Sequence, residues 1–326
     1  MLTPRWRKVI RDLWGNKTKT VLVVLAIAVG LFAFGSVFIT QEIMVTGMNS
    51  EYRAVNSSGI IFHTQPFDDN LLRWVRQQPE VADAQGMASY VVKMFGGNKT
   101  YNLTLLAYED NNNITINRIT PEQGAWPPAR KEIVFERSSL PLAMAEIGDT
   151  VTLELSNGRN YELNISGTVH DLNAYPGTMV PLPTAFVSRQ TLEWLGFSGQ
   201  CNQIHITAVD STGIPALEKT ASALKERLQE KGFPIYSTQV RDPREHWART
   251  TTESFSLILF SLGIFTLILS AFLVVNTITA LVTQQKRQIG IMKAVGGMRK
   301  QIISLYLVLV SFYGLLALLI ALPISL

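Results

Sequence analysis

The sequence predicts a membrane protein that combines α-helical transmembrane spans with an inserted extracytoplasmic α/β (α+β) domain. Three observations support this fold class. Long uncharged segments lie near both ends of the chain, basic residues gather in two short segments beside them, and strand-like and helix-like patterns alternate in between. With 326 residues, 47% hydrophobic and 17% charged, the chain is too polar for a bundle of spans and too apolar for a simple soluble enzyme.

Transmembrane helix 1 is expected at residues 20–40, which contain no charged side chain. At 1.5 Å per residue this helix would be about 31 Å long, enough to cross a hydrocarbon core of roughly 30 Å. A cleaved signal peptide would have a shorter apolar core and a small-residue cleavage motif, and this segment has neither. We therefore expect an uncleaved membrane anchor.

Two further spans are expected near the end of the sequence. The uncharged run 254–285 would be about 48 Å long if helical throughout and so would project past the membrane; transmembrane helix 2 is expected at residues 254–284 of this run. Residues 302–325 form transmembrane helix 3, which Pro323 ends or kinks.

Charge predicts the orientation of these spans. Residues 1–19 hold six basic residues and one acid, whereas 24 of the 25 acidic residues fall within residues 41–253. The connection between the second and third spans has five basic residues and no acid, namely Lys286, Arg287, Lys293, Arg299 and Lys300. Short basic segments stay in the cytoplasm, so the N-terminus should be cytoplasmic and residues 41–253 extracytoplasmic. The net charge of +4 follows from this partition and gives no reason to expect a nucleic-acid partner.

Residues 1–19 carry an apolar stripe at helical spacing. Basic side chains lie largely off this stripe, which consists of Trp6, Val9, Ile10, Leu13 and Trp14. The pattern predicts an amphipathic helix that lies among the lipid headgroups as an interfacial anchor.

Residues 41–253 are long enough for one sizeable domain or two small ones. The patterns predict strands at 59–63, 89–95, 101–107, 132–135, 148–155, 161–169, 203–209 and 233–240, and helices at 68–78 and 214–231. Asn157-Gly158, between two of these strands, is a strong signal for a tight hairpin turn.

The segment 285–301 is the most informative part of the chain. Apolar residues recur at helical spacing against its basic positions, which predicts a short amphipathic helix; they are Ile289, Met292, Ala294 and Val295. Three glycines, Gly290, Gly296 and Gly297, permit a helix end or the close approach of another chain. Composition alone favours a helix that anchors to lipid headgroups.

The exact string favours another interpretation. Residues 285–297, QKRQIGIMKAVGG, closely resemble the signature of FtsX/MacB-type ABC-transporter permeases. In that family the segment follows the second membrane helix and docks onto a separate ATPase subunit. The stretch IGDTVTL, after GAWP and EIVF, is similar to the MacB-like periplasmic core domain of the same permeases.

This resemblance implies a set of ATPase-coupling residues: Lys286, Arg287, Gln288, Ile289, Gly290, Lys293, Gly296 and Gly297. The family usually has Glu where this chain has Gln288, so a salt bridge made by that acid cannot form here. A helix like that of residues 1–19 lies next to the ATPase in the family, which gives this segment a second role beside lipid anchoring.

The resemblance further implies a permease subunit that couples ATP hydrolysis in a cytoplasmic ABC ATPase to conformational change of its extracytoplasmic domain, for export or extraction of a substrate. It implies a second permease subunit, homologous or identical, and a location in the plasma (inner) membrane. A protein partner outside the membrane is also compatible with it. ATP and Mg belong to the partner ATPase, and no cofactor is expected in this chain. The family has a fourth span, which we expect beyond Leu326 or in another polypeptide.

The chain itself is not expected to be an enzyme. Its sequence has no G-x-x-x-x-G-K-[ST] motif, and its four histidines show no metal-ligand spacing. His170-Asp171 could act as a base and its orienting acid, but neighbours in a strand point to opposite faces. Cys201 is the single cysteine and forms no internal disulfide. The competing hypothesis is a membrane-anchored sensor or adaptor, independent of any ATPase, with a ligand-binding extracytoplasmic domain.

Overall fold

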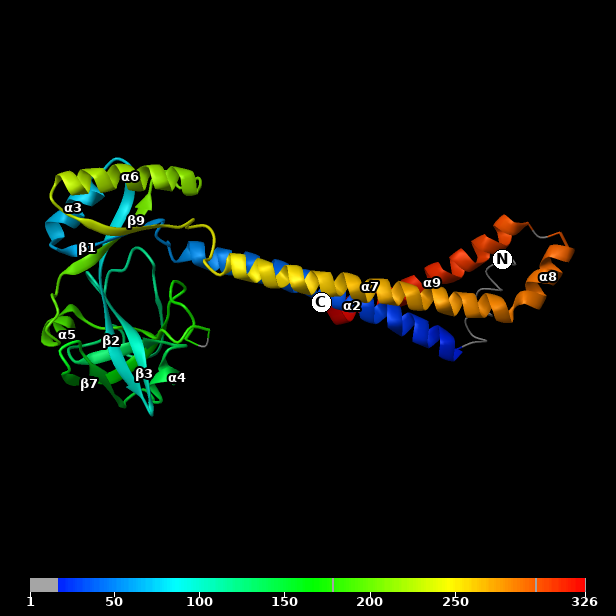
Figure 1. Cartoon of the computed structure of the whole chain (residues 1–326), viewed down its shortest axis with the longest axis horizontal. Helices are drawn as coiled ribbons and strands as arrows, with labels where there is room; N and C mark the ends of the chain where they lie inside the picture. Colours follow the sequence, from blue (N-terminus) through cyan, green and yellow to red (C-terminus); the bar gives the residue numbers. More distant parts are fainter. Residues whose placement is uncertain (1–16, 178, 297, 326) are drawn as a thin grey trace. The chain divides into compact units, whose positions relative to one another are not determined.

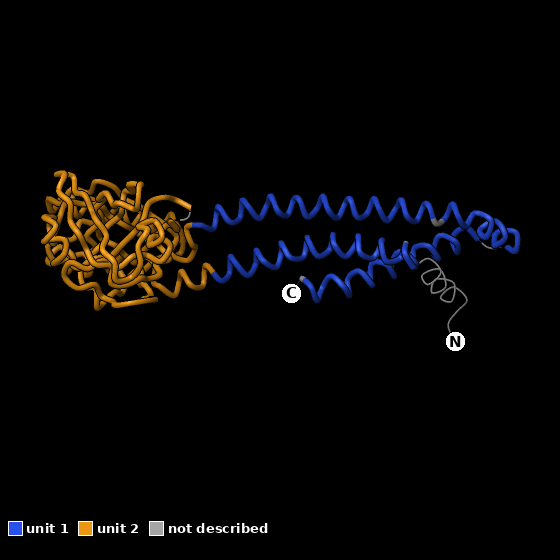
Figure 2. The backbone as a smooth tube through the Cα atoms, turned by 90° about the horizontal axis from the view of Figure 1, so that it is seen from below, with its two compact units in different colours: residues 1–47, 248–326 blue, residues 48–247 orange. Residues whose placement is uncertain are grey.

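The structure, a computed structural model, describes residues 17–177, 179–296 and 298–325. The chain divides into two compact units, which Figure 2 colours separately. Unit 1 comprises residues 1–47 and 248–326, and unit 2 comprises residues 48–247. Each unit is described on its own below.

Unit 1 is helical. Its long helices are α2 (Lys17–Ala54), whose last turns belong to unit 2, α7 (Arg249–Gln284) and α9 (Arg299–Ser325), and the short helix α8 (Lys286–Ala294) lies between the last two. All three long helices are long and apolar enough to cross a membrane. Most of the large apolar side chains of α7 are exposed, as expected for a helix that faces lipid.

Small residues seat α7 against α2. The Ser270 hydroxyl donates a hydrogen bond to the Ala26 carbonyl at 2.9 Å. A Cβ atom at Gly30 would lie 2.7 Å from the Ser270 Oγ, so this close approach requires glycine. On α9, Tyr313 and Ala317 are fully buried in a cluster with Val23 of α2. The spacing of Ala26 and Gly30 therefore has a packing role in this fold.

Helix α2 is longer than the apolar segment 20–40 from which a span was expected. Residues 41–54 are more polar, but they contain no proline, and half of them are good helix formers. Charge marks the limit of a hydrocarbon-crossing segment, whereas a helix ends only where its hydrogen bonding stops. The helix therefore continues to Ala54.

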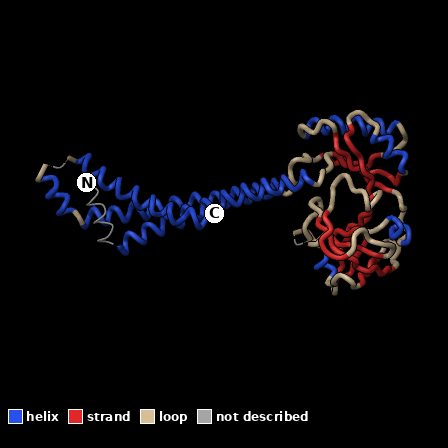
Figure 3. The backbone as a smooth tube through the Cα atoms, turned by 180° about the vertical axis from the view of Figure 1, so that it is seen from behind, coloured by secondary structure: helices blue, strands red, loops and turns tan. Residues whose placement is uncertain are grey.

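Unit 2 is a mixed α/β domain (Figure 3). Its strands are β1 (Ile60–Phe67), β2 (Val81–Gly96), β3 (Lys99–Tyr108), β4 (Thr120–Gly124), β5 (Glu132–Glu136), β6 (Thr150–Glu154), β7 (Asn160–His170), β8 (Thr184–Phe186), β9 (Cys201–Ala208) and β10 (Ile235–Val240). Its helices are α3 (Asp69–Arg76), α4 (Leu140–Ala143), α5 (Arg189–Trp194) and α6 (Ile214–Glu230). The strand order is β10-β1-β9-β2-β3-β8-β5-β7-β4, and β6 pairs with both β2 and β7.

The two largest hydrophobic cores of unit 2 pack against different parts of this sheet. One lies under α3 and α6, which cover a single face of β1 and β9 (Figure 1). The other fills the ring that β2, β3, β8, β5, β7 and β6 close through their pairings. Strand β2 is long enough to join both, because its first half pairs with β9 and its second half with β3 and β6.

Candidate functional site

The candidate site begins at a sharp break between two helices. Helix α7 ends at Gln284 and α8 begins at Lys286, so Gln285 alone makes the turn. The Tyr306 hydroxyl of α9 donates a hydrogen bond to Oε1 of Gln285 at 2.9 Å. Tyr306 is only 9% exposed, so water competes little for this bond. This hydrogen bond therefore links the turn between α7 and α8 to α9.

A glycine ends α8. Gly296 has φ of +96°, a left-handed conformation that costs other residues energy, and its N–H reaches the Lys293 carbonyl at 3.0 Å. The chain then enters α9, where Gln301 reaches back to accept a hydrogen bond from the Met298 N–H at 3.3 Å. Both ends of α8 are therefore fixed by specific contacts.

Positive charge covers the outside of this segment. Lys286, Arg287, Lys293, Arg299 and Lys300 are all exposed. No described residue forms an ion pair with any of these five side chains. Residues 285–301 contain no acidic side chain. Within the described chain, their charge is thus available to a partner.

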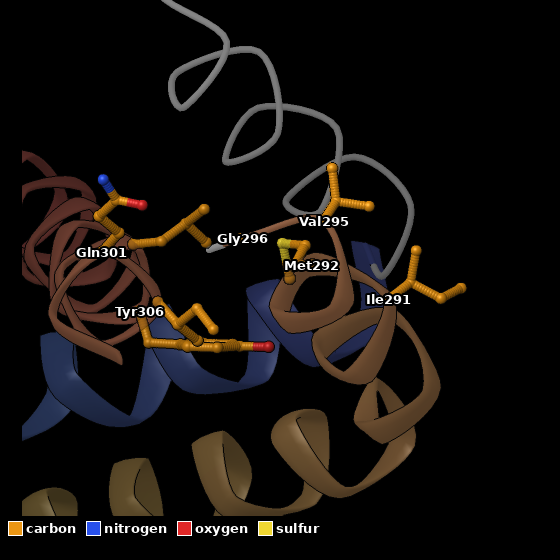
Figure 4. A pocket seen from close by; sticks show the side chains of 8 residues that line it. Ile291, Met292, Val295, Gly296, Gln301 and Tyr306 are labelled. Carbon is orange, nitrogen blue, oxygen red and sulfur yellow. The ribbon is translucent and has the colours of Figure 1, made fainter. Parts of the chain in front are cut away.

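Apolar side chains lie beside these charges. Ile291, Val295 and Met298 are 57%, 84% and 68% exposed. A groove of about 510 Å³ runs between α8 and the start of α9 (Figure 4). Its lining residues are Ile291, Met292, Val295, Gly296, Gln301, Ile302, Leu305 and Tyr306. The combination of a concave apolar groove and a cationic rim is typical of a surface that receives a protein partner.

The expected coupling residues occupy different positions in this surface. Gln288 is exposed, and a Cβ atom at Gly290 would have no neighbour within 4 Å, so packing within the described chain does not require glycine there. Ile289 is half-buried and packs against the cluster of unit 1 helices, which makes it a supporting residue. Gly297 and the stripe Trp6, Val9, Ile10, Leu13 and Trp14 lie outside the described residues.

Sequence reasoning missed the contribution of α9. Tyr306 was expected only as part of an apolar span, and Gln301 only as the last residue of segment 285–301 without a role of its own. A tyrosine one turn or two inside the basic end of a span is a usable signal, because its hydroxyl seeks a polar partner. Here that partner is Gln285.

The pair His170-Asp171 does not form a base and its orienting acid. His170 contacts Arg137 at 3.3 Å, and its Nδ1 is 3.9 Å from Oε1 of Glu136. Asp171 follows the end of β7 and lines a separate cavity. Cys201 is buried, and burial raises the pKa of its thiol to about 12.

The chain is similar in sequence to known proteins. Residues 260–326, which include α8 and α9, match the model described as FtsX-like permease C-terminal. Macrolide export ATP-binding/permease protein MacB 1 of Yersinia pestis bv. Antiqua is 23% identical over 94% of this chain and 50% of its own length. The same values hold for MacB 1 of Yersinia pseudotuberculosis serotype I. The chain thus spans about half the length of the curated relatives it matches.

Two solved structures are also similar to parts of the chain. The extracellular domain of the noncanonic ABC-type transporter YknZ from Gram-positive bacteria has a TM-score of 0.39 and 10% identity, covering 57% of this chain and 100% of its own. The periplasmic region of MacB from Actinobacillus actinomycetemcomitans has a TM-score of 0.36 and 12% identity, covering 61% of this chain and 94% of its own. The C-terminal region of the chain thus matches an FtsX-like permease model, and most of the chain is similar to MacB proteins.

Proposed function

We propose that this chain is an FtsX/MacB-type permease subunit that couples ATP hydrolysis in a cytoplasmic ABC ATPase to conformational change of unit 2, in order to export or extract a substrate. The observation that carries the proposal is the α8 surface, defined by five exposed cations and by Ile291, Val295 and Met298. Exposed apolar side chains beside unpaired charges of one sign favour a partner with an apolar contact and an acidic rim. ATP and Mg would bind to that ATPase.

The contacts of α8 suggest how a movement would spread. A displacement of α8 acts on α7 through the single residue Gln285 and on α9 through the hydrogen bond from Tyr306. Helix α7 extends over 36 residues, about 54 Å, so its far end lies well beyond one hydrocarbon thickness. A stiff element of this length can pass a displacement along its axis.

The remaining partners belong to the same proposal. The many exposed apolar side chains of α7 and α9 suit lipid and a second permease subunit, identical or related. The stripe from Trp6 to Trp14 would anchor the N-terminal segment at the cytoplasmic interface of the plasma (inner) membrane. Unit 2 would then face the extracytoplasmic side, where a protein partner could bind it.

Gentle detergent purification from the native membrane tests the docking. A P-loop ATPase should co-purify with the unmodified protein, and the purified complex should hydrolyse ATP. Lys293→Glu should weaken this association by at least tenfold, because charge reversal at a cationic contact changes attraction into repulsion. Lys219→Glu reverses an exposed charge on α6 and should leave the association unchanged.

Two outcomes would decide against the proposal. Retention of the ATPase by Lys293→Glu at the level of the unmodified protein would show that the α8 surface does not dock it. A purification without any ATPase would favour the competing hypothesis, an ATPase-independent sensor or adaptor that binds its ligand through unit 2.

A further inference from the structure

Unit 2 contains a partly buried polar face that the proposed function does not use. Along β1 and β9, residues alternate between the two faces of the sheet. Ile60, Phe62, Ile204 and Ile206 point into the core under α3 and α6. The opposite face carries His63, Gln203 and His205 instead, and His205 is only 6% exposed. His63 and Gln203 are half-buried, and the polar atoms of this face that lie away from water must find partners.

A chain of hydrogen bonds crosses this face and ends without a partner. Nδ2 of Asn117 donates to Nδ1 of His205 at 2.8 Å, and Nε2 of His205 donates to Oε1 of Gln203 at 3.1 Å. Nε2 of Gln203 then donates to Nδ1 of His63 at 3.3 Å. Burial and the nearby Arg241 lower the pKa of both histidines, so each ring is neutral. The proton of His63 therefore lies on Nε2, which is buried and has no partner.

Two opposite charges line the same space as this unused donor. Arg241 follows β10, and its guanidinium donates to Oε1 of Gln239 at 2.7 Å. The Asp171 side chain is buried with 7% exposure, and Oδ1 accepts the Asn173 N–H at 2.8 Å. Among the described residues Arg241 and Asp171 form no ion pair with one another. The buried amide nitrogen of Asn173 is a second donor without a partner.

These groups surround a cavity of about 280 Å³. Apolar side chains, including Met87, Leu106 and Leu182, complete its lining. Its volume is just below the range of roughly 300–1,000 Å³ found for drug-sized ligands, which indicates a smaller molecule. We propose that this cavity binds a small zwitterion of amino-acid size, with its carboxylate toward Arg241 and His63 and its ammonium group toward Asp171.

One wall of the cavity is held in place before any ligand arrives. Asp171, Asn173, Ala174 and Tyr175 belong to one loop. The Leu172 carbonyl in this loop accepts hydrogen bonds from Nε2 of His246 at 3.1 Å and Nε1 of Trp247 at 3.2 Å. The Tyr175 ring also packs against Trp247, with 4.6 Å between ring centroids. A preformed wall reduces the entropy lost on binding and favours a specific ligand.

Equilibrium dialysis of the full chain in detergent micelles tests the proposal. The probe is a mixture of the twenty proteinogenic amino acids at equal concentration, measured by mass spectrometry on both sides of the membrane. At least one amino acid should be retained. Its amine analogue without the carboxylate, and its acid analogue without the ammonium group, should each bind at least tenfold more weakly, since each leaves one charge of the cavity without a partner.

Variants assign the binding to this cavity. Arg241→Gln and Asp171→Asn should each weaken retention by at least tenfold. The matched controls are Arg244→Gln, whose arginine pairs with Asp242 at 2.7 Å, and Asp210→Asn on an exposed loop, and both should bind as the unmodified chain does.

The proposal is independent of ATPase docking, since Lys293→Glu should leave retention unchanged. Retention of no amino acid would overturn it. Equal binding of the acid analogue would also overturn it, because a plain carboxylate site would then be present. The analogue comparison uses only the unmodified chain, so a variant that failed to fold would not obscure the result.

Discussion

At the scale of single residues, Asp171 and His205 are buried groups with opposite responses to pH. Burial, with a further contribution from Glu136, raises the pKa of the Asp171 carboxyl to about 6. Burial, followed by the charges of Arg241 and His63, lowers the pKa of His205 to about 3. Below the ordinary histidine pKa, His205 is protonated in the unfolded chain but stays neutral in the folded one. The free energy of unfolding therefore decreases at this residue as the pH falls. Asp171 acts in the opposite sense, because its folded form holds the proton up to about pH 6.

Asp171→Asn should remove the contribution of Asp171 to the pH dependence of the free energy of unfolding. The substitution keeps an oxygen that can accept the Asn173 N–H, but it removes the carboxyl whose ionisation is costly when buried. Relative to the unmodified chain, the free energy of unfolding should rise by about 2 kcal/mol between pH 4.5 and pH 7. Urea unfolding followed by the tryptophans of unit 2 measures this difference.

A matched variant defines the baseline of that experiment. Asp210 is exposed, and hydrogen bonds from Thr212 lower its pKa, so Asp210→Asn should produce no such rise over this pH range. A difference between Asp171→Asn and the unmodified chain that stayed constant with pH would show that Asp171 titrates normally in the fold.

At the scale of elements, Tyr306 should determine how firmly α8 is held. Tyr306→Phe removes the hydrogen bond to Gln285 while the ring still packs, which should cost about 1 kcal/mol, the typical contribution of one such bond. Amide hydrogen exchange in α8 should accelerate about fivefold as a result. Mass spectrometry of the detergent-solubilised chain can follow these peptides.

The matched control for this element is Tyr236→Phe, since Tyr236 is 68% exposed on β10 in unit 2. That variant should leave exchange in α8 unchanged. Unchanged exchange in Tyr306→Phe would mean that α8 is held by its packing contacts alone, such as those of Ile289.

Elements with a strong local period were predictable from sequence. The amphipathic pattern at residues 214–231 is confirmed as α6, and the hairpin at Asn157-Gly158 joins β6 to β7. Short elements were missed, because β8 spans only Thr184–Phe186 and owes its form to pairing with β3 and β5. Strand β4 has every residue exposed and so shows no apolar alternation.

The α8 surface and the cavity of unit 2 also differ in how far the sequence could predict them. The α8 surface was predictable because its charges and glycines lie within one short segment of the sequence, residues 286–300. The cavity of unit 2 was not, because His63, Asp171, His205 and Arg241 come from distant segments that only the sheet brings together. A polar residue at every second position of β1 and β9 fits a water-exposed face equally well, so the pattern alone did not reveal burial.

At the scale of the whole molecule, the distribution of charge makes a prediction about topology. Acidic residues lie almost entirely in residues 41–253, whereas residues 285–301 carry only basic charge. Because basic segments beside a span resist translocation, unit 2 and α8 should lie on opposite sides of the membrane. Single-cysteine reporters can test this, with Lys219→Cys on α6 and Arg287→Cys on α8, both at exposed positions.

A membrane-impermeant maleimide added to intact cells should label Lys219→Cys and leave Arg287→Cys unlabelled until the membrane is permeabilised. The native Cys201 should contribute no background, because it is buried and its pKa is raised to about 12, which keeps its thiol protonated. The chain without a reporter is the control for this. Labelling of Arg287→Cys in intact cells would place α8 outside, and no cytoplasmic ATPase could then reach it. This single result bears on the entire mechanism, since docking at α8 and exposure of unit 2 to the outside both require the same orientation of α7.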